Sequence, residues 1–270
     1  MKFALNYSPQ AVELLKTGQI EIDNFKCPDW LWMITEASQL RPVAVHFTLT
    51  AGDGKIEKTD WSLVEKLLET TGTPFVNLHL ESRKKDFPSL PFDTTATVHQ
   101  EQIYVKMVGD INVVTKRFGA EKVIIENVPY RGKMGKVLRP SVEPGLIHRI
   151  LEETGCGLLF DLSHARIAAF YLQMKLDDYL DQLPMNRMRE MHFTGMKWME
   201  GKLTDHLEAQ ESDWQALDKG IDRIHRGEWP EPWLIAFEYG GVGEAFAWRS
   251  EISIIASQVP KLYQLIHHRS

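Results

Sequence analysis

Short apolar runs alternate along the chain with longer amphipathic stretches. Eight runs rich in β-branched and other apolar residues predict strands: Lys2–Asn6, Ile20–Lys26, Val43–Leu49, Phe75–Leu80, Lys122–Asn127, Gly157–Leu162, Met188–Thr194 and Trp233–Tyr239. Between them, apolar residues recur every three or four positions, which predicts helices. The clearest of these stretches are Trp61–Glu69, His99–Phe118, Pro144–Thr154, Trp214–Arg226 and Glu251–His267.

This alternation predicts the architecture. Strands separated by helices imply parallel strands joined by right-handed crossovers, and eight such units in about 250 residues favour closure into a barrel. We therefore expect an α/β fold, a (β/α)₈ TIM barrel forming a single domain over residues 1–270. The alternative is an open doubly wound sheet. It is disfavoured because neither GxGxxG nor GxxxxGK[ST] follows an early strand.

Composition narrows the classes of partner. The chain has 270 residues, 43% of them hydrophobic, with a formal net charge of −6 and a pI near 5.9. This balance disfavours duplex DNA as a partner, because such binding normally needs a dominant basic field. No apolar run has the length of a membrane span or a secretory signal, so we expect a cytoplasmic protein without membrane association. Cys27 and Cys156 lack CxxC spacing and are expected to be reduced thiols.

Ionisable residues stand at the ends of six consecutive predicted strands. In a barrel the carboxyl ends of the strands converge on one mouth, where catalytic groups lie. The six residues are His46, His79, Glu126, Asp161, His192 and Glu238. Three more candidates follow closely, His164 after Asp161 and the adjacent pair Asp205 and His206 after the seventh strand.

This residue set points to metal ions. A single histidine or carboxylate at a strand end is more often a hydrogen-bonded structural group, but here six strands share the pattern. Glu126, Asp161 and Glu238 each follow a strongly apolar run, where an ionised carboxylate is costly to bury without a cation. Imidazole and carboxylate without thiolate suit iron, zinc or manganese, and several carboxylates allow bridging between ions.

Other residues near the predicted mouth are candidates for binding substrate. Arg83 and Arg131 lie in basic loops after the strands that end on His79 and Glu126. Such loops would attract an anionic substrate group, or would simply be solvated and balance the ligand carboxylates. Asn6 and Lys26 end the first two strands, and Asn127 follows Glu126, so all three could contact substrate. Lys26 could equally pair with a ligand carboxylate.

The order of ligands, His…His…Glu…Asp-x-x-His…His…Asp-His…Glu, resembles that of the xylose isomerase-like barrel superfamily. This superfamily includes the endonuclease IV enzymes and the DUF692, or multinuclear non-haem iron oxidase, proteins. The resemblance spans nearly the whole chain and rests on the order of the ligands, since no single short motif carries it.

The resemblance implies three ligand sets. One ion would be held by His46, His79 and Glu126; a second, bridged by Glu126, by Asp161, His192 and Glu238; a third by His164, Asp205 and His206. Two departures affect the third set. Asp205 and His206 are adjacent where the endonucleases have Asp-x-His, which would turn one of them away, and His164 differs from the Asp-x-Asn-Asn segment of the oxidases. Two or three divalent ions are therefore implied, with iron favoured and zinc or manganese as alternatives.

The resemblance to the DUF692 oxidases favours an iron-dependent oxidase that acts on a peptide or small thiol substrate. Those relatives modify cysteine-containing peptides with the help of a partner protein, and the basic loops favour an anionic substrate. One alternative is a metal-dependent hydrolase of phosphodiesters or phosphate esters, in which a metal-bound hydroxide attacks. Others are a sugar isomerase or epimerase and a metal-bearing binding protein without turnover, because the fold alone does not choose a reaction.

Overall fold

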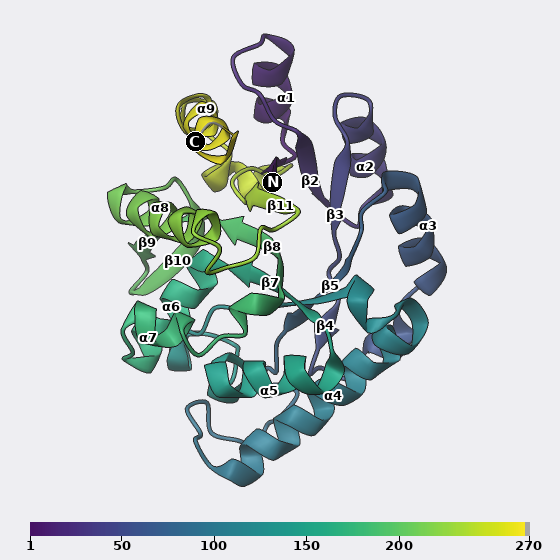
Figure 1. Cartoon of the computed structure of the whole chain (residues 1–270), viewed down its shortest axis with the longest axis vertical. Coiled ribbons are helices and arrows are strands. Elements are labelled where there is room, and N and C mark those ends of the chain that lie inside the picture. Colours follow the sequence, from purple (N-terminus) through teal and green to yellow (C-terminus); the bar gives the residue numbers. More distant parts are fainter. Residues whose placement is uncertain (268–270) are drawn as a thin grey trace.

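The computed structural model describes residues 1–267 and places parallel strands inside a ring of helices (Figure 1). The parallel strands are β1 (Lys2–Asn6), β2 (Asn24–Pro28), β3 (Val43–His46), β4 (Thr50–Ala51), β5 (Val76–Leu80), β6 (Val123–Glu126), β7 (Gly157–Asp161), β8 (Met188–Phe193) and β11 (Leu234–Phe237). A separate antiparallel hairpin consists of β9 (Gly195–Met199) and β10 (Lys202–Leu207).

The helices cover the outside of the sheet (Figure 1). They are α1 (Pro9–Lys16), α2 (Leu31–Ser38), α3 (Trp61–Thr71), α4 (Thr97–Phe118), α5 (Pro144–Thr154), α6 (Leu162–Leu172), α7 (Leu176–Leu180), α8 (Glu211–His225) and α9 (Ile252–His267). No helix within residues 1–267 is both long enough and apolar enough to cross a membrane.

The sheet closes on itself through one interrupted strand. Its order is β3-β2-β1-β11-β8-β7-β6-β5-β4, and β3 and β4 are two parts of one strand separated by residues 47–49. The β4 part pairs with β5 through its backbone. The β3 part and the residue after it are linked to β5 and the loop before it by side chains instead. Val45 N donates to Thr73 Oγ1 (3.0 Å), and Phe47 N donates to Asn77 Oδ1 (2.7 Å). The predicted (β/α)₈ barrel is confirmed.

Alternation along the strands separates the core from the barrel interior. On β1, Phe3 and Leu5 belong to the large cluster that packs against the helices, whereas Ala4 belongs to a small cluster with Ala44, Leu234 and Ala236. Successive side chains of a strand point to opposite faces. The next inward positions of β2, β3 and β11 are Lys26, His46 and Glu238. The alternation therefore delivers polar side chains to the mouth above a layer of small apolar residues.

Several element boundaries differ from the prediction. The second strand begins at Asn24 and not at Ile20. Ile20 and Ile22 are buried in the loop before it, so they look like strand residues in the sequence although they pair with no neighbouring strand. The third ends at His46 before the interruption. Helix α6 was not predicted because most of its residues are buried, which removes the amphipathic pattern. The β9–β10 hairpin was not predicted either.

Candidate metal centre

Strand register brings the predicted ligands together at the carboxyl ends of the strands. His79 of β5 stands opposite Glu126 of β6, and Asp161 of β7 stands opposite His192 of β8. Opposite residues on neighbouring strands lie within side-chain reach. All nine predicted ligands lie in one cluster. His46, His79 and Glu126 contact one another within 4 Å, and the others belong to groups whose potential ligand atoms lie within 4.8 Å of one another.

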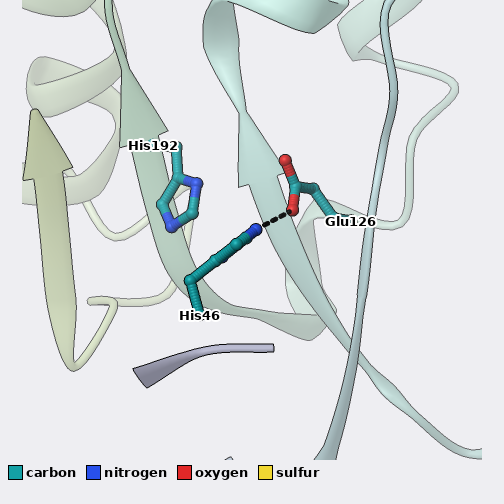
Figure 2. A group of neighbouring side chains, drawn as sticks. All are labelled: His46, Glu126 and His192. Carbon is teal, nitrogen blue, oxygen red and sulfur yellow. Dashed lines mark ion pairs between the residues drawn. The ribbon is translucent and has the colours of Figure 1, made fainter. Parts of the chain in front are cut away.

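The first group consists of His46, His79 and Glu126. The two Nε2 atoms lie 3.1 Å apart, and each is 3.4 Å from Glu126 Oε2; Figure 2 shows His46 directed at this carboxylate. Asn77 Nδ2 lies 3.4 Å from His46 Nδ1. Burial, together with the nearby Lys26 and His79, holds the pKa of His46 well below its usual value. The imidazole is therefore neutral, as a metal ligand must be.

The second group consists of Asp161, His192 and Glu238. His192 is fully buried, with Nδ1 3.0 Å from Glu238 Oε1 and Nε2 2.8 Å from Glu190 Oε1. Burial alone would lower the pKa of His192, but Glu238 and Glu190 outweigh it and raise the pKa to about 10. The metal-free imidazole is thus a cation that partly neutralises the carboxylates around it.

The third group consists of His164, Asp205 and His206. His164 Nε2 lies 3.2 Å from Asp205 Oδ2, and its Nδ1 lies 3.4 Å from Glu126 Oε1. Adjacent strand residues normally point apart, yet both Asp205 and His206 reach this group. The β10 register shifts between Thr204 and Leu207, and His206 adopts a left-handed φ of 60°. The expectation that one of the pair turns away is therefore wrong, because a bulge redirects both side chains.

One functional neighbour, Glu190, is absent from the predicted set. It accepts a hydrogen bond from buried Lys26 and from Trp233 Nε1 (2.9 Å), and it contacts His192 Nε2. A carboxylate can only accept, so Nε2 carries a proton and Nδ1 is left for the ligand group. Glu190 lies two residues before His192, on the same face of β8. This spacing was the available signal.

The proposed substrate residues divide into two kinds. Asn6 and Lys26 line a cavity of about 320 Å³. Six of the nine candidate ligands line it as well: His46, His79, Glu126, His164, His206 and Glu238. Arg83 instead pairs with Glu81. Arg131 donates to Leu203 O (2.6 Å) and pairs with Asp205 (3.0 Å).

Asn127 has a structural environment. Its side chain joins β6 to β7, because Nδ2 donates to Asp161 O and Oδ1 accepts from Asp161 N, both at 2.8 Å. Its carbonyl lies 2.9 Å from His164 Nδ1. Asn127 therefore holds two candidate ligands in place and does not line the cavity.

The site has the properties of a metal centre. Glu126 Oε2 and His192 Nδ1 are buried, and neither forms a well-oriented hydrogen bond within the described residues, although both lie close to other candidate ligands. Buried polar atoms are rarely left unsatisfied unless something else completes them. Oxygen and nitrogen donors without thiolate match borderline divalent ions such as zinc, iron and manganese. The residues present therefore fit bound metal.

Solved structures with the same fold support the architecture. The chain aligns with the IolI protein, whose structure contains a bound zinc atom, at a TM-score of 0.59 and 14% identity over 100% of both chains. It aligns with D-psicose 3-epimerase from Clostridium cellulolyticum H10 at 0.57 and 11% identity, over 98% and 97%. With endonuclease IV from Thermus thermophilus the values are 0.52 and 13%, over 92% and 96%.

Sequence comparison identifies the family. A UPF0276 protein from Psychromonas ingrahamii is 38% identical over 53 residues, which is 20% of this chain and 19% of that protein. The family model described as "RiPP precursor modification enzyme MbnB/TglH/ChrH" matches residues 24–230. The resemblance to the DUF692 proteins is confirmed. The chain belongs to the MbnB/TglH/ChrH family of RiPP precursor modification enzymes.

Proposed function

We propose that this protein is an iron-dependent oxidase that modifies a peptide at a thiol group. The observation that carries the proposal is the convergence of nine His, Asp and Glu side chains at the barrel mouth, with the buried Glu126 carboxylate among them. The chain's membership in a family of peptide-modifying enzymes supports the choice of substrate.

Three sets of residues would hold the ions, the first two sharing Glu126: His46, His79 and Glu126; Glu126, Asp161, His192 and Glu238; and His164, Asp205 and His206. Bound iron would supply the electron transfer and dioxygen chemistry that protein side chains lack. The chain supplies the charge balance. Its carboxylates neutralise the cations, and the Lys26–Glu190 pair holds His192 in one tautomer.

The cavity gives the substrate access to the cluster. Tyr7, Trp30, Met33 and Phe246 form apolar parts of its wall, which reduces the water around a bound group. Cys27 also lines the cavity, but burial raises the pKa of its thiol to about 12. Because thiolates are the form that binds metal, this thiol does not compete with a substrate thiol.

Metal analysis tests the proposal. The protein should be purified without oxygen and analysed for iron and zinc, then mixed with a cysteine-containing precursor peptide while oxygen uptake is followed. We expect two or three iron ions per chain and oxygen uptake that needs the peptide. The control is the same peptide with serine in place of cysteine. Stoichiometric zinc without iron, or peptide modification that continues without oxygen, would contradict the proposal.

A metal-dependent hydrolase is the second candidate. It is favoured by the shared Glu126 carboxylate, whose two oxygens face different imidazole groups, because two-metal hydrolases also place bridging groups between their ions. Zinc-loaded protein that cleaves a phosphodiester and consumes no oxygen would select this function over the oxidase.

A further inference from the structure

The loop after β11 carries an arginine that lines the cavity beside the candidate ligands. Arg249 ends the 3₁₀ helix Glu244–Arg249 and shares the cavity wall with Glu238 and His206. Within residues 1–267, no acceptor forms a hydrogen bond or ion pair with its guanidinium, and its Nε is buried without a partner. Arg83 and Arg131, by contrast, are both paired with carboxylates.

The structure holds this guanidinium in place. Its central carbon lies 4.7 Å from the ring centroid of Phe246 and 5.8 Å from that of Trp248. The loop is fixed to the barrel because Ser250 Oγ donates to Phe246 O (2.9 Å) and Glu251 N donates to the Tyr239 hydroxyl (3.2 Å). Cation–π contacts therefore hold the guanidinium in place, and no carboxylate within residues 1–267 pairs with it.

Burial of this cation has a cost. Burial lowers the pKa of Arg249, and the more distant charges of Glu238 and Asp205 only partly oppose the effect. The group remains charged, because an arginine is not deprotonated near neutral pH. A partly desolvated cation without a hydrogen-bonded counter-charge gains more from a bound anion than one in water.

We propose that Arg249 binds a carboxylate of the substrate, in a subsite adjacent to the metal-ligand cluster. This inference rests on the proposed function, since it places part of the peptide in the same cavity. A singly charged carboxylate matches one guanidinium, whereas a phosphate dianion would also face the carboxylates of Glu238 and Asp205. The apolar wall suits an apolar group attached to the carboxylate.

Binding of small probes tests this subsite. The probes are 3-phenylpropionate, its uncharged amide and phenyl phosphate, titrated by calorimetry into metal-free and zinc-loaded protein. We expect 3-phenylpropionate to bind best in both forms. Arg249→Met should weaken this binding roughly tenfold or more, because a charge-assisted hydrogen bond is lost. Arg249→Lys should show an intermediate loss, and Arg149→Met, a distant arginine paired with Glu101, should show none.

Peptide probes distinguish two sources of the carboxylate. A short acetylated peptide with a free carboxyl terminus is compared with an amidated peptide that carries an internal glutamate. Arg249-dependent binding of the first assigns the subsite to a chain terminus, and of the second to an acidic side chain.

Three results would overturn the subsite. They are wild-type protein that binds neither 3-phenylpropionate nor the peptides, affinity unchanged in both Arg249 variants, and binding that disappears when metal is removed. Thermal unfolding and metal content are measured for each variant to exclude misfolding. The metal-free titration needs no turnover, so it tests the subsite separately from the oxidase. If the purified protein contains no iron and takes up no oxygen but still shows Arg249-dependent binding, the oxidase is rejected and the subsite is kept.

Discussion

The two oxygens of Glu126 face different parts of the candidate centre. Oε2 lies 3.4 Å from both His46 Nε2 and His79 Nε2, and Oε1 lies 3.4 Å from His164 Nδ1. The side chain is only 1% exposed. A carboxylate in this position can serve two ligand groups with its two oxygens. A neutral amide has only one oxygen and serves them less well.

Glu126→Gln is therefore expected to lower metal content by at least one ion per chain. The amide keeps the volume but removes the negative charge that offsets a cation. Elemental analysis of wild-type and variant protein, reconstituted in parallel, measures the loss. Glu57→Gln on the surface serves as the control. Wild-type metal content in Glu126→Gln would reject the bridging role.

The buried Lys26–Glu190 pair gives a second prediction, about stability. Both residues are 2% exposed, and Glu190 also contacts His192. Glu190→Gln leaves the buried Lys26 cation without its carboxylate and removes one of the two carboxylates beside His192, which should cost about 3–5 kcal/mol. Lys26→Met should cost less, because Glu190 keeps His192 as a partner.

A double-mutant cycle in the metal-free protein measures this coupling by denaturant unfolding. The double variant Lys26→Met with Glu190→Gln should lose less stability than the sum of the two single variants. Strict additivity would show that the two side chains do not act as a pair.

At the residue scale, sequence position located the side chains that the structure brings together. Each of His46, Glu126 and Glu238 could be identified because it ends an apolar strand. Glu190 and Arg249 could not be identified in the same way. The partner of Glu190, Lys26, lies 164 residues away in the chain. Arg249 has no carboxylate partner within residues 1–267, and the sequence does not show which arginines form such pairs.

At the element scale, the β9–β10 hairpin positions part of the candidate centre. Its bulge directs Asp205 and His206 to the same side, and His206 N donates to Thr194 Oγ1 (3.2 Å). The strands approach closely at Gly195, where an added Cβ would overlap the Glu208 carbonyl and lie 2.6 Å from Ala209 N. Only glycine fits this backbone contact.

Gly195→Ala is expected to displace the hairpin, destabilise the fold by roughly 1–3 kcal/mol and reduce occupancy of the third ligand group. Thermal unfolding and elemental analysis provide the two readouts. Gly145→Ala in α5 is the matched control, because its added Cβ meets nothing within 4 Å and alanine favours a helix. Equal behaviour of the two variants would contradict this role for the hairpin.

The elements differed in how far sequence predicted them. Helix α5 was predicted at its observed bounds, Pro144–Thr154, because a proline begins it and Gly155 adopts the left-handed conformation that ends it. The hairpin escaped prediction. Its β9 strand is only partly buried and follows β8 after a single residue, so no apolar pattern separates the two.

At the scale of the whole molecule, the charges of the centre predict how the metal-free protein responds to acid. Burial would raise the pKa of Glu190, but Lys26 and His192 lower it to about 2, and nearby histidines hold the pKa values of Glu238 and Asp205 well below normal. These depressed values stabilise the fold above about pH 4.5, the ordinary glutamate range, and that contribution is lost as pH falls.

The alkaline side has the opposite sign. Burial opposes the charge of His164 and His192, but neighbouring carboxylates raise both pKa values to about 10. Their contribution is complete below pH 6.5, the ordinary histidine value, and is lost as pH rises toward 10.

Between about pH 4.5 and 6 the lowered pKa of His46 and the raised pKa of Asp161, about 6, have opposite effects on stability. Stability of the metal-free protein should therefore be greatest between about pH 4.5 and 6.5. Denaturant unfolding at a series of pH values measures the profile. Bound metal should remove the alkaline decline, because it keeps the imidazoles neutral. A metal-free profile that is flat from about pH 6 to 9 would contradict the prediction.

The barrel itself was the most predictable level of the structure, because eight strand–helix alternations depend on many residues and survive errors at individual boundaries. The point of closure was not predictable. It depends on Thr73 and Asn77 replacing backbone partners across a broken strand, and nothing in the spacing of apolar residues marks those two side chains.

That closure has a mechanical consequence. His46 ends β3 and His79 lies on β5, on the two sides of the gap that is joined by side chains. An ion held by both would hold the two sides of this gap together. Amide hydrogen exchange along residues 43–51 would then report whether this ion is bound, and the measurement needs no substrate.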